Sequence, residues 1–380
     1  MEEPRKIVLI LGNGFDLDRG LKTSYKDFWE SEYCPKKYPA PLIYHLNQCW
    51  HNNLDAVRWY DLENELWNYY NTLPEPKIGV DILTEAEILF LKGFDERIAV
   101  YGDEKHLQIA ASLVNKGVLS TNGNLFCYFN DLYKDDALKP PYWRDRMALS
   151  IIKEGLCKYI KSLGLSANDN NTIAFEVISL LDVAAENGDI VDIYTFNYTQ
   201  VQFRSRDISF AKVHYMHGSC EDGRIIIGTR DDSAFNDNYD FLQKSFDPSF
   251  YPSALVEDLK SADEVVFFGH SIGENDRQYF KAFFKQLVSD TKVTRKDIFF
   301  FTRDNDSEIQ LKRALQKMTD SNLSTLFSQN HIQIIKTKNI QEDQHRLYDF
   351  MIAHGAEKVE TQRFIGNLIK LESSKNTDNQ

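Results

Sequence analysis

Residues 6–16 read Lys-Ile-Val-Leu-Ile-Leu-Gly-Asn-Gly-Phe-Asp, an apolar run that leads directly into the turn Gly12-Asn13-Gly14. Many nucleotide-binding α/β domains begin with a buried strand and a glycine turn, because the backbone N–H groups that follow face a phosphate. Gly12 can adopt a positive φ, and Gly14 has no Cβ to obstruct a pyrophosphate. The third glycine of the Gly-x-Gly-x-x-Gly fingerprint is missing, since Leu17 occupies its position. The turn therefore indicates a nucleotide site only in combination with other motifs.

The composition predicts a globular protein with a sizeable core, since 42% of the 380 residues are hydrophobic and 13% are aromatic. The net charge of -13 argues against sequence-independent binding to nucleic acid or to an anionic membrane, which needs a basic surface. The N-terminus does not resemble a signal peptide, and no apolar run approaches the ~20 residues of a membrane span. The 5 cysteines are scattered and form no Cys-x-x-Cys pair. We expect a cytoplasmic protein without a disulfide framework or a bound metal.

The pattern of the chain changes near residue 187. Residues 31–186 are helical in pattern, as in the 3.6-residue spacing of Trp59, Leu62, Leu66 and Tyr70. After them come short, mostly unbroken apolar runs of the kind found in a parallel sheet covered on both faces. The predicted strands after the first are residues 190–196, 213–216, 225–227, 265–268, 298–301 and 332–335.

These patterns predict an α/β fold with a mostly parallel sheet and a large helical insertion. Residues 1–30 and 187–345 would form the discontinuous core, and residues 31–186 the insertion. Residues 346–380 would form a C-terminal helix and a polar tail, which we expect to fray from Ser373 onward.

Polar segments follow the apolar runs at several predicted strand ends, where open α/β sheets bind ligands. These segments are residues 12–16, 195–199, 217–219 and 269–271. One such segment would mean little, but together they predict a single cleft.

Individual residues in and near these segments allow more than one interpretation. His217 is a candidate general base because imidazole titrates near neutral pH, although a histidine at a strand end is often structural. His214 would point to the opposite face of the strand, so the two histidines would bind one metal poorly. Asn197 and Asp16 could simply cap turns. Glu63 lies on the apolar stripe of its helix, where a carboxylate needs a partner or a catalytic purpose; the alternative is a position at the rim of the stripe.

Residues 269–273, Gly-His-Ser-Ile-Gly, match the Gly-x-Ser-x-Gly nucleophile elbow of serine hydrolases. Asp304 with His331 or His345 would complete the order Ser, Asp, His. However, there is no His-Gly-Gly-Gly oxyanion segment, and the N-terminal glycine turn would have no explanation. For these reasons a serine hydrolase that uses Ser271 is only an alternative function.

The motifs resemble those of the bacteriophage abortive infection AbiH family of bacterial phage-defence proteins. The resemblance implies a role as an anti-phage effector, and the sequence does not name the phage-derived trigger. The motifs occur in the family's order along most of the chain: residues 12–17, 20–25, 196–199, 217–218 and 269–271, with Asp276.

The same order of elements is similar, more distantly, to the Sir2-like fold, whose members bind NAD in a Rossmann-like domain with a helical insert. This resemblance implies NAD or a related nucleotide as substrate or ligand, and N-glycosidic cleavage with His217 as base and Asn197 holding a water or the ribose. It also implies a possible homo-oligomer. The residues implied to meet or line the nucleotide are Gly12, Asn13, Gly14, Phe15, Asp16, Ser24, Tyr198, Gly218, Gly269, His270, Ser271 and Asp276, with Glu63 as a possible additional acid.

Three residues depart from the Sir2-like pattern and leave the identity of the nucleotide open. Asn13 replaces a small alanine, Asp16 replaces a hydroxyl residue, and Thr199 stands where an acidic residue often follows the Asn-Tyr pair. A carboxylate beside a pyrophosphate is unfavourable unless a cation or hydrogen bonds offset it. A nucleotide-sensing or protein-binding module without turnover is therefore the second class of function that we consider.

Overall fold

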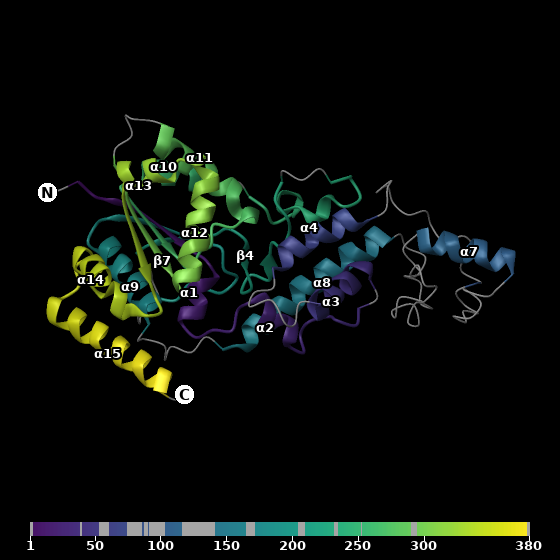
Figure 1. Ribbon diagram of the computed structural model, residues 1–380, viewed down its shortest axis with the longest axis horizontal. Coiled ribbons are helices and arrows are strands. Elements are labelled where there is room, and N and C mark those ends of the chain that lie inside the picture. Colours follow the sequence, from purple (N-terminus) through teal and green to yellow (C-terminus); the bar gives the residue numbers. More distant parts are fainter. Residues whose placement is uncertain are drawn as a thin grey trace. The chain divides into compact units, whose positions relative to one another are not determined.

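The computed structural model (Figure 1) describes residues 3–38, 40–52, 61–73, 86, 90, 103–115, 141–164, 172–203, 210–231, 235–251, 253–289 and 295–377. Trp59, which we used to predict a helix, lies outside these residues. The helix itself is present as α4, Leu62–Thr72, and the side chain of Asp61 caps it by accepting a hydrogen bond from the Asn64 N–H.

A six-stranded parallel sheet forms the centre of the fold, in the order β3-β2-β1-β6-β7-β8. The chain starts in the middle of the sheet, builds outward to β3, and returns to the other side of β1 with β6. This is the doubly wound order of dinucleotide-binding folds, and its switch point lies between β1 and β6. The strands are β1 (Lys6–Leu11), β2 (Ile190–Thr195), β3 (Lys212–Tyr215), β6 (Glu264–Phe268), β7 (Asp297–Thr302) and β8 (His331–Lys336). The predicted α/β fold with a mostly parallel sheet is confirmed.

One predicted strand is wrong in extent and position. Of the strand predicted at residues 225–227, only Ile225 lies in a strand, β5 (Arg224–Ile225). This strand pairs antiparallel with β4 (Gly218–Ser219), outside the main sheet. Gly218 makes this hairpin possible because its φ is +74° and a Cβ there would lie 2.0 Å from the Arg224 carbonyl oxygen. The chain therefore turns back immediately after β3.

Helices cover both faces of the sheet, which explains why most of its strands contain an apolar run (Figure 1). In β1, Ile7 and Leu9 contact the hydrophobic layer formed with α9, α14 and α15. Val8 and Ile10 point the other way, into the layer formed with α10, α11, α12 and α13. The bounds of these helices are α9 Ile173–Glu186, α10 Leu255–Ser261, α11 Arg277–Ser289, α12 Asn305–Met318, α13 Leu323–Gln329, α14 Ile340–Ala353 and α15 Lys358–Thr377.

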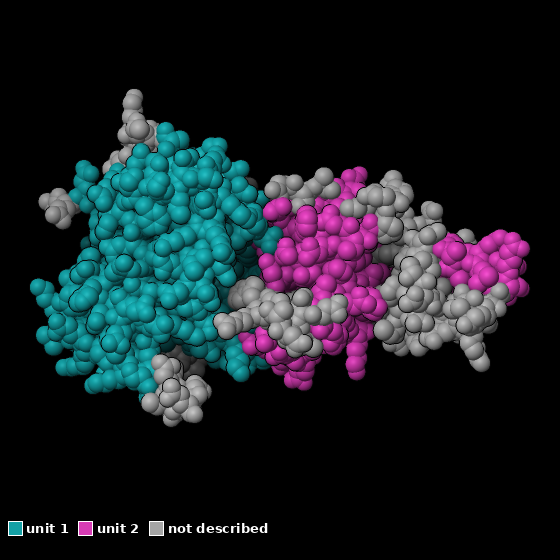
Figure 2. Space-filling model, in the orientation of Figure 1, with its two compact units in different colours: residues 1–24, 160–225, 251–380 teal, residues 25–159, 226–250 magenta. Residues whose placement is uncertain are grey.

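The chain forms two compact units, drawn in different colours in Figure 2. Unit 1, residues 1–24, 160–225 and 251–380, contains the sheet. Unit 2 consists of residues 25–159 and 226–250. Compared with the bounds expected from the sequence, α9 belongs with the sheet and residues 226–250 belong with the insertion. The helices that lie wholly or mainly in unit 2 are α2 (Tyr25–Glu30), α3 (Pro41–Asn52), α4, α7 (Glu104–Asn115) and α8 (Pro141–Ser162), with the short turns η3 (Asp240–Leu242) and η4 (Lys244–Phe246).

Two buried polar residues of unit 2, Asp145 and Lys244, have partners within the unit. Asp145 accepts hydrogen bonds from the Leu42 N–H and from the Tyr69 hydroxyl, at 2.9 and 2.5 Å. Lys244, which is 0% exposed, forms an ion pair with Glu63 at 3.0 Å. The carboxylate that stood out on the apolar stripe of α4 therefore has a cationic partner within its own unit.

Two further features bear on the sequence-based expectations. The frayed tail expected from Ser373 is wrong at its start, because α15 continues to Thr377 and the Ser373 hydroxyl donates to the Ile369 carbonyl. Among the helices of the described residues, none combines the length and the apolar character that crossing a membrane requires.

Candidate functional site

The glycine turn after β1 packs directly against the backbone of the turn after β6. The N–H groups of Gly12 and Gly14 donate to the carbonyls of Phe268 and Gly269, at 3.0 and 2.9 Å. A Cβ on Gly12 would lie 2.5 Å from the His270 Cα, and one on Gly14 would lie 2.6 Å from the Gly269 Cα. Gly12 has a φ of -117°, so the positive φ that its sequence allows is not used. The crossing of two chain segments thus accounts for both glycines.

Asn197 joins the end of β2 to this turn. Its side-chain nitrogen donates to the Gly12 carbonyl at 3.0 Å, and its backbone N–H donates to the Thr195 hydroxyl at 3.1 Å. The residue is buried. Asn197 therefore fixes the geometry at the carboxyl ends of β1 and β2.

His217 and His270 lie on either side of the Asp276 carboxylate. The Nε2 of His217, after β3, is 3.5 Å from Asp276 Oδ1, and the Nε2 of His270, after β6, is 3.5 Å from Asp276 Oδ2. Asp276 ends the short turn η5, Glu274–Asp276, which leads into α11. The Phe196 ring packs edge-on against both imidazoles, with centroids 5.2 Å from His217 and 4.5 Å from His270. Two histidines predicted at separate strand ends thus share one carboxylate.

The protonation of His270 follows from its hydrogen bonds. The Ile272 N–H donates to His270 Nδ1 at 3.0 Å, so Nδ1 carries no proton and Nε2–H faces Asp276. Ile272 has a φ of +49°, which is unusual for a β-branched residue. Its side chain is buried in the core, which holds the strained turn in place. The strain therefore serves to orient His270.

Asp16 and Thr199, two of the departures from the Sir2-like pattern, contact each other. The Thr199 hydroxyl donates to Asp16 Oδ2 at 2.7 Å. Burial raises the pKa of Asp16 from 3.8 to about 6, and the Thr199 hydrogen bond and the nearby Arg19 charge oppose that rise. Arg19 is buried, and its Nη2 donates to Gln202. Within the described residues Asp16 Oδ1 and the Nε and Nη1 of Arg19 have no hydrogen-bond partner.

The other predicted ligand-lining residues occupy varied positions. Asn13 Oδ1 accepts from the Thr23 hydroxyl at 2.6 Å, and the Phe15 ring is buried against Phe268, so Phe15 belongs to the core. The Tyr198 ring lies 6.4 Å from that of His217. The remaining residues on this list are Gly218, Gly269 and Ser24, which are half-buried, and Ser271, which is exposed.

His214 and His331 each contact an aspartate of a neighbouring strand. His214 contacts Asp192 at 2.9 Å and stacks on Tyr194, in agreement with a structural role. His331 starts β8 and contacts Asp297, which starts β7. Ser271 follows the other end of the parallel strand β6, so a strand length of roughly 17 Å separates it from His331.

The remaining members of the proposed hydrolase triad are also not brought together. Asp304 caps α12 by accepting from the Ser307 N–H. His345 is exposed on α14, which packs on the opposite face of the sheet from the layer that contains Ile272. The structure therefore does not bring Ser271 of the predicted nucleophile elbow together with Asp304 and either His331 or His345.

The strand order and the polar groups at the switch point define a Rossmann-like α/β protein. A family model described as "Bacteriophage abortive infection AbiH" matches residues 8–301. The chain belongs to this AbiH family of phage abortive-infection proteins, as its motifs predicted. The match extends from β1 into β7 and includes every strand-end segment of the site. No curated protein and no solved structure matches the chain.

Proposed function

We propose that this protein is an anti-phage abortive-infection effector that binds NAD or a related nucleotide and hydrolyses its N-glycosidic bond. The observation that carries the proposal is the buried His217 imidazole facing the Asp276 carboxylate at the switch-point edge of a doubly wound sheet. Nucleotides bind at this edge in folds of this order. An imidazole paired with a carboxylate is a common arrangement for a general base.

The reaction would need few groups. The bond between ribose C1′ and the nicotinamide nitrogen breaks, its electron pair leaves with nicotinamide, and a water oxygen attacks the oxocarbenium-like C1′. His217 would take the proton from that water and release it to solvent. Because the carboxylate of Asp276 lies 3.5 Å from His217 Nε2, it would stabilise the imidazolium as it forms. The products would be nicotinamide and ADP-ribose.

The surroundings of Asp276 support its role as a positioning residue. His270 presents Nε2–H to one carboxylate oxygen, which leaves the other oxygen facing His217. The Phe196 ring packs against both imidazoles and limits their rotation. Rigid support of this kind keeps a base in a productive orientation.

Two contacts near the glycine turn are compatible with a nucleotide in the cleft. Asn197 uses its side-chain nitrogen to hold Gly12, and its side-chain oxygen can accept from a water or a ribose hydroxyl. The Thr199 hydrogen bond and the Arg19 charge reduce the electrostatic penalty of Asp16 beside a phosphate. The departures from the Sir2-like pattern therefore compensate for one another.

The test is to incubate the purified chain with NAD and to separate nicotinamide and ADP-ribose by chromatography. We expect turnover by the wild type, and its loss in His217→Ala and in Asn197→Ala. His331→Ala is the matched control, because His331 is on the same sheet but at the opposite strand ends, and it should retain activity. Nucleotide binding without turnover by the wild type would favour the sensing alternative. Turnover that survives His217→Ala would overturn the proposed site.

A further inference from the structure

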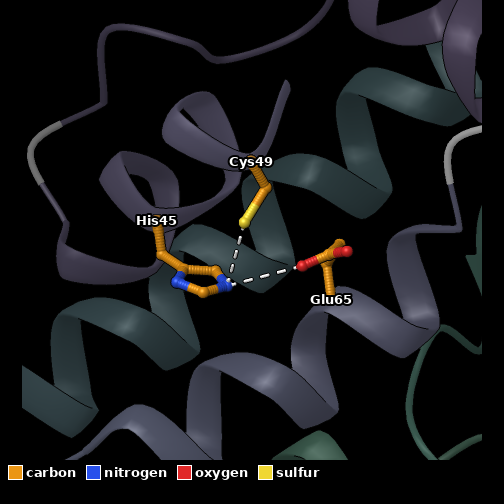
Figure 3. A group of neighbouring side chains, drawn as sticks. All are labelled: His45, Cys49 and Glu65. Atoms are coloured by element: carbon orange, nitrogen blue, oxygen red, sulfur yellow. Dashed lines mark hydrogen bonds and ion pairs between the residues drawn. The ribbon is translucent and has the colours of Figure 1, made fainter. Parts of the chain in front are cut away.

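Three side chains with metal-binding atoms converge in unit 2, far along the chain from the histidines of the sheet. His45 and Cys49 are one turn apart on α3, and Glu65 projects from α4 (Figure 3). The Cys49 Sγ is 3.4 Å from His45 Nε2, and Glu65 Oε2 is 3.6 Å from the same nitrogen. All three ligand atoms lie within 4.8 Å of one another. In the described part of the chain this is the one such group of histidine, cysteine and acidic side chains.

The distances match those between the ligands of a tetrahedral zinc ion. With bonds of about 2.3 Å to sulfur and about 2.0 Å to nitrogen or oxygen, tetrahedral angles place a nitrogen and a sulfur ligand about 3.5 Å apart, and a nitrogen and an oxygen ligand about 3.3 Å apart. The observed separations of 3.4 and 3.6 Å agree with these values. The three ligand atoms lie within 4.8 Å of one another, so one ion would bind all three once the side chains adjust.

The geometry does not fit a cysteine nucleophile activated by histidine. In such a triad the thiol contacts one ring nitrogen and the acid contacts the other, so that the acid orients the base. Here Cys49 and Glu65 both approach Nε2 of His45, as Figure 3 shows. The three ligand atoms instead lie close together, as the ligands of one ion do.

We propose that His45, Cys49 and Glu65 form a binding site for Zn²⁺ or a similar borderline divalent cation. His45 would bind through Nε2 with its proton on Nδ1, Cys49 as the thiolate after its proton passes to solvent, and Glu65 through Oε2. Imidazole and thiolate favour zinc over magnesium or calcium, which prefer oxygen ligands alone. The side chains of His45 and Glu65 are 18% and 16% exposed, so a fourth position is open to water. The ion would connect α3 to α4.

Neighbouring residues support the ligands in the way that outer shells do. The side-chain nitrogen of Asn68, one turn after Glu65 on α4, donates to Glu65 Oε2 at 3.3 Å. The Tyr69 ring lies 5.3 Å from the His45 imidazole, and its hydroxyl is held by the buried Asp145. The orientations of both Glu65 and His45 are therefore set by residues of unit 2 itself.

The test uses the full chain, stripped of metal with a chelator and titrated with Zn²⁺ against a chromogenic competitor. A second titration uses Co²⁺, whose tetrahedral complexes are coloured and show a thiolate charge-transfer band. We expect one equivalent of either metal to bind, with that band present. Cys49→Ser should abolish the band, and His45→Ala or Glu65→Gln should weaken Zn²⁺ binding by more than about 100-fold, since losing outer-shell partners alone costs about 10–100-fold.

His51→Ala and Cys34→Ser are the matched controls, because His51 is exposed on the same helix and Cys34 is a free thiol in the same unit. Both controls should bind as the wild type does. Circular dichroism of each metal-free variant checks its fold, and Glu65→Gln changes shape least. A wild type that binds no Zn²⁺ at micromolar concentration, or a well-folded Glu65→Gln that binds as tightly as the wild type, would overturn the proposal. Either result is independent of NAD turnover.

Discussion

Replacing Gly269 with alanine tests the backbone crossing that builds the site. Gly269 has a φ of +63°, which costs a residue with a Cβ about 1–2 kcal/mol. The new Cβ would also lie 2.4 Å from the Cα and C atoms of Gly14, and neither is the end of a flexible side chain. Overpacking of this kind costs about 1–3 kcal/mol. We therefore expect Gly269→Ala to lower the free energy of unfolding by about 2–5 kcal/mol.

Gly20→Ala is the control that separates the two contributions. Gly20 has a φ of +81°, but a Cβ there would have nothing within 4 Å, so only the conformational cost of about 1–2 kcal/mol applies. Urea unfolding of both variants, followed by circular dichroism, measures the difference. If the proposed function holds, Gly269→Ala should also lose NAD turnover, because the displaced turn carries His270. If Gly269→Ala is no less stable than Gly20→Ala, the two turns do not pack as described.

Three other substitutions test buried charge and helix stability. Burial raises the pKa of Asp16 from 3.8 to about 6, so the folded state binds a proton at this carboxyl more tightly than the unfolded state does. The resulting stabilisation is complete below pH 4 and is lost as the pH rises through 6. Urea unfolding at several pH values should show Asp16→Asn gaining up to about 3 kcal/mol on the wild type between pH 4 and 7; parallel profiles would contradict this. Lys244→Met leaves the Glu63 carboxylate without its ion-pair partner, and should destabilise by about 3–5 kcal/mol in the same assay. Gly366→Ala, within α15 and with open space for a Cβ, should stabilise by about 1 kcal/mol, and a lower thermal midpoint would be inconsistent with this.

The sheet could be predicted because its central strands are buried on both faces, which makes them short apolar runs. The segment Ile-Phe-Phe-Phe in β7 is an example. The strand order could not be derived from these runs, since each would fit several neighbours. The β4–β5 hairpin was missed as such because it depends on one close approach at Gly218, which apolar periodicity does not reveal.

The site residues that follow strand ends could be predicted from the sequence. The contacts between their side chains could not. Asn197, His217 and His270 follow strands that lie in one sheet, so the sequence brought them to the same edge. The shared contact with Asp276 depends on the path of η5, for which the sequence has no periodic signal. The Asp16–Thr199 hydrogen bond joins two residues that each depart from the Sir2-like pattern, and no sequence pattern pairs them.

The cation site has a partial signal in the sequence. His45 and Cys49 have the i, i+4 spacing that places two side chains on one helix face, whereas Glu65 comes from another helix and cannot be assigned by spacing. The scattered cysteines indicated no metal because they contain no Cys-x-x-Cys pair. Ligands contributed by two packed helices require the tertiary structure.

The proposed function requires that His217 and Asp276 act together as one catalytic unit on the nucleotide. The most direct measurement is the rate of nicotinamide release from NAD by the wild type, His217→Ala, Asp276→Asn and the double variant. We expect each single substitution to remove most of the activity and the double variant to be no slower than His217→Ala, since residues that act as a unit are not additive. Losses that multiply in the double variant, or a wild type that releases no nicotinamide, would contradict the proposed function.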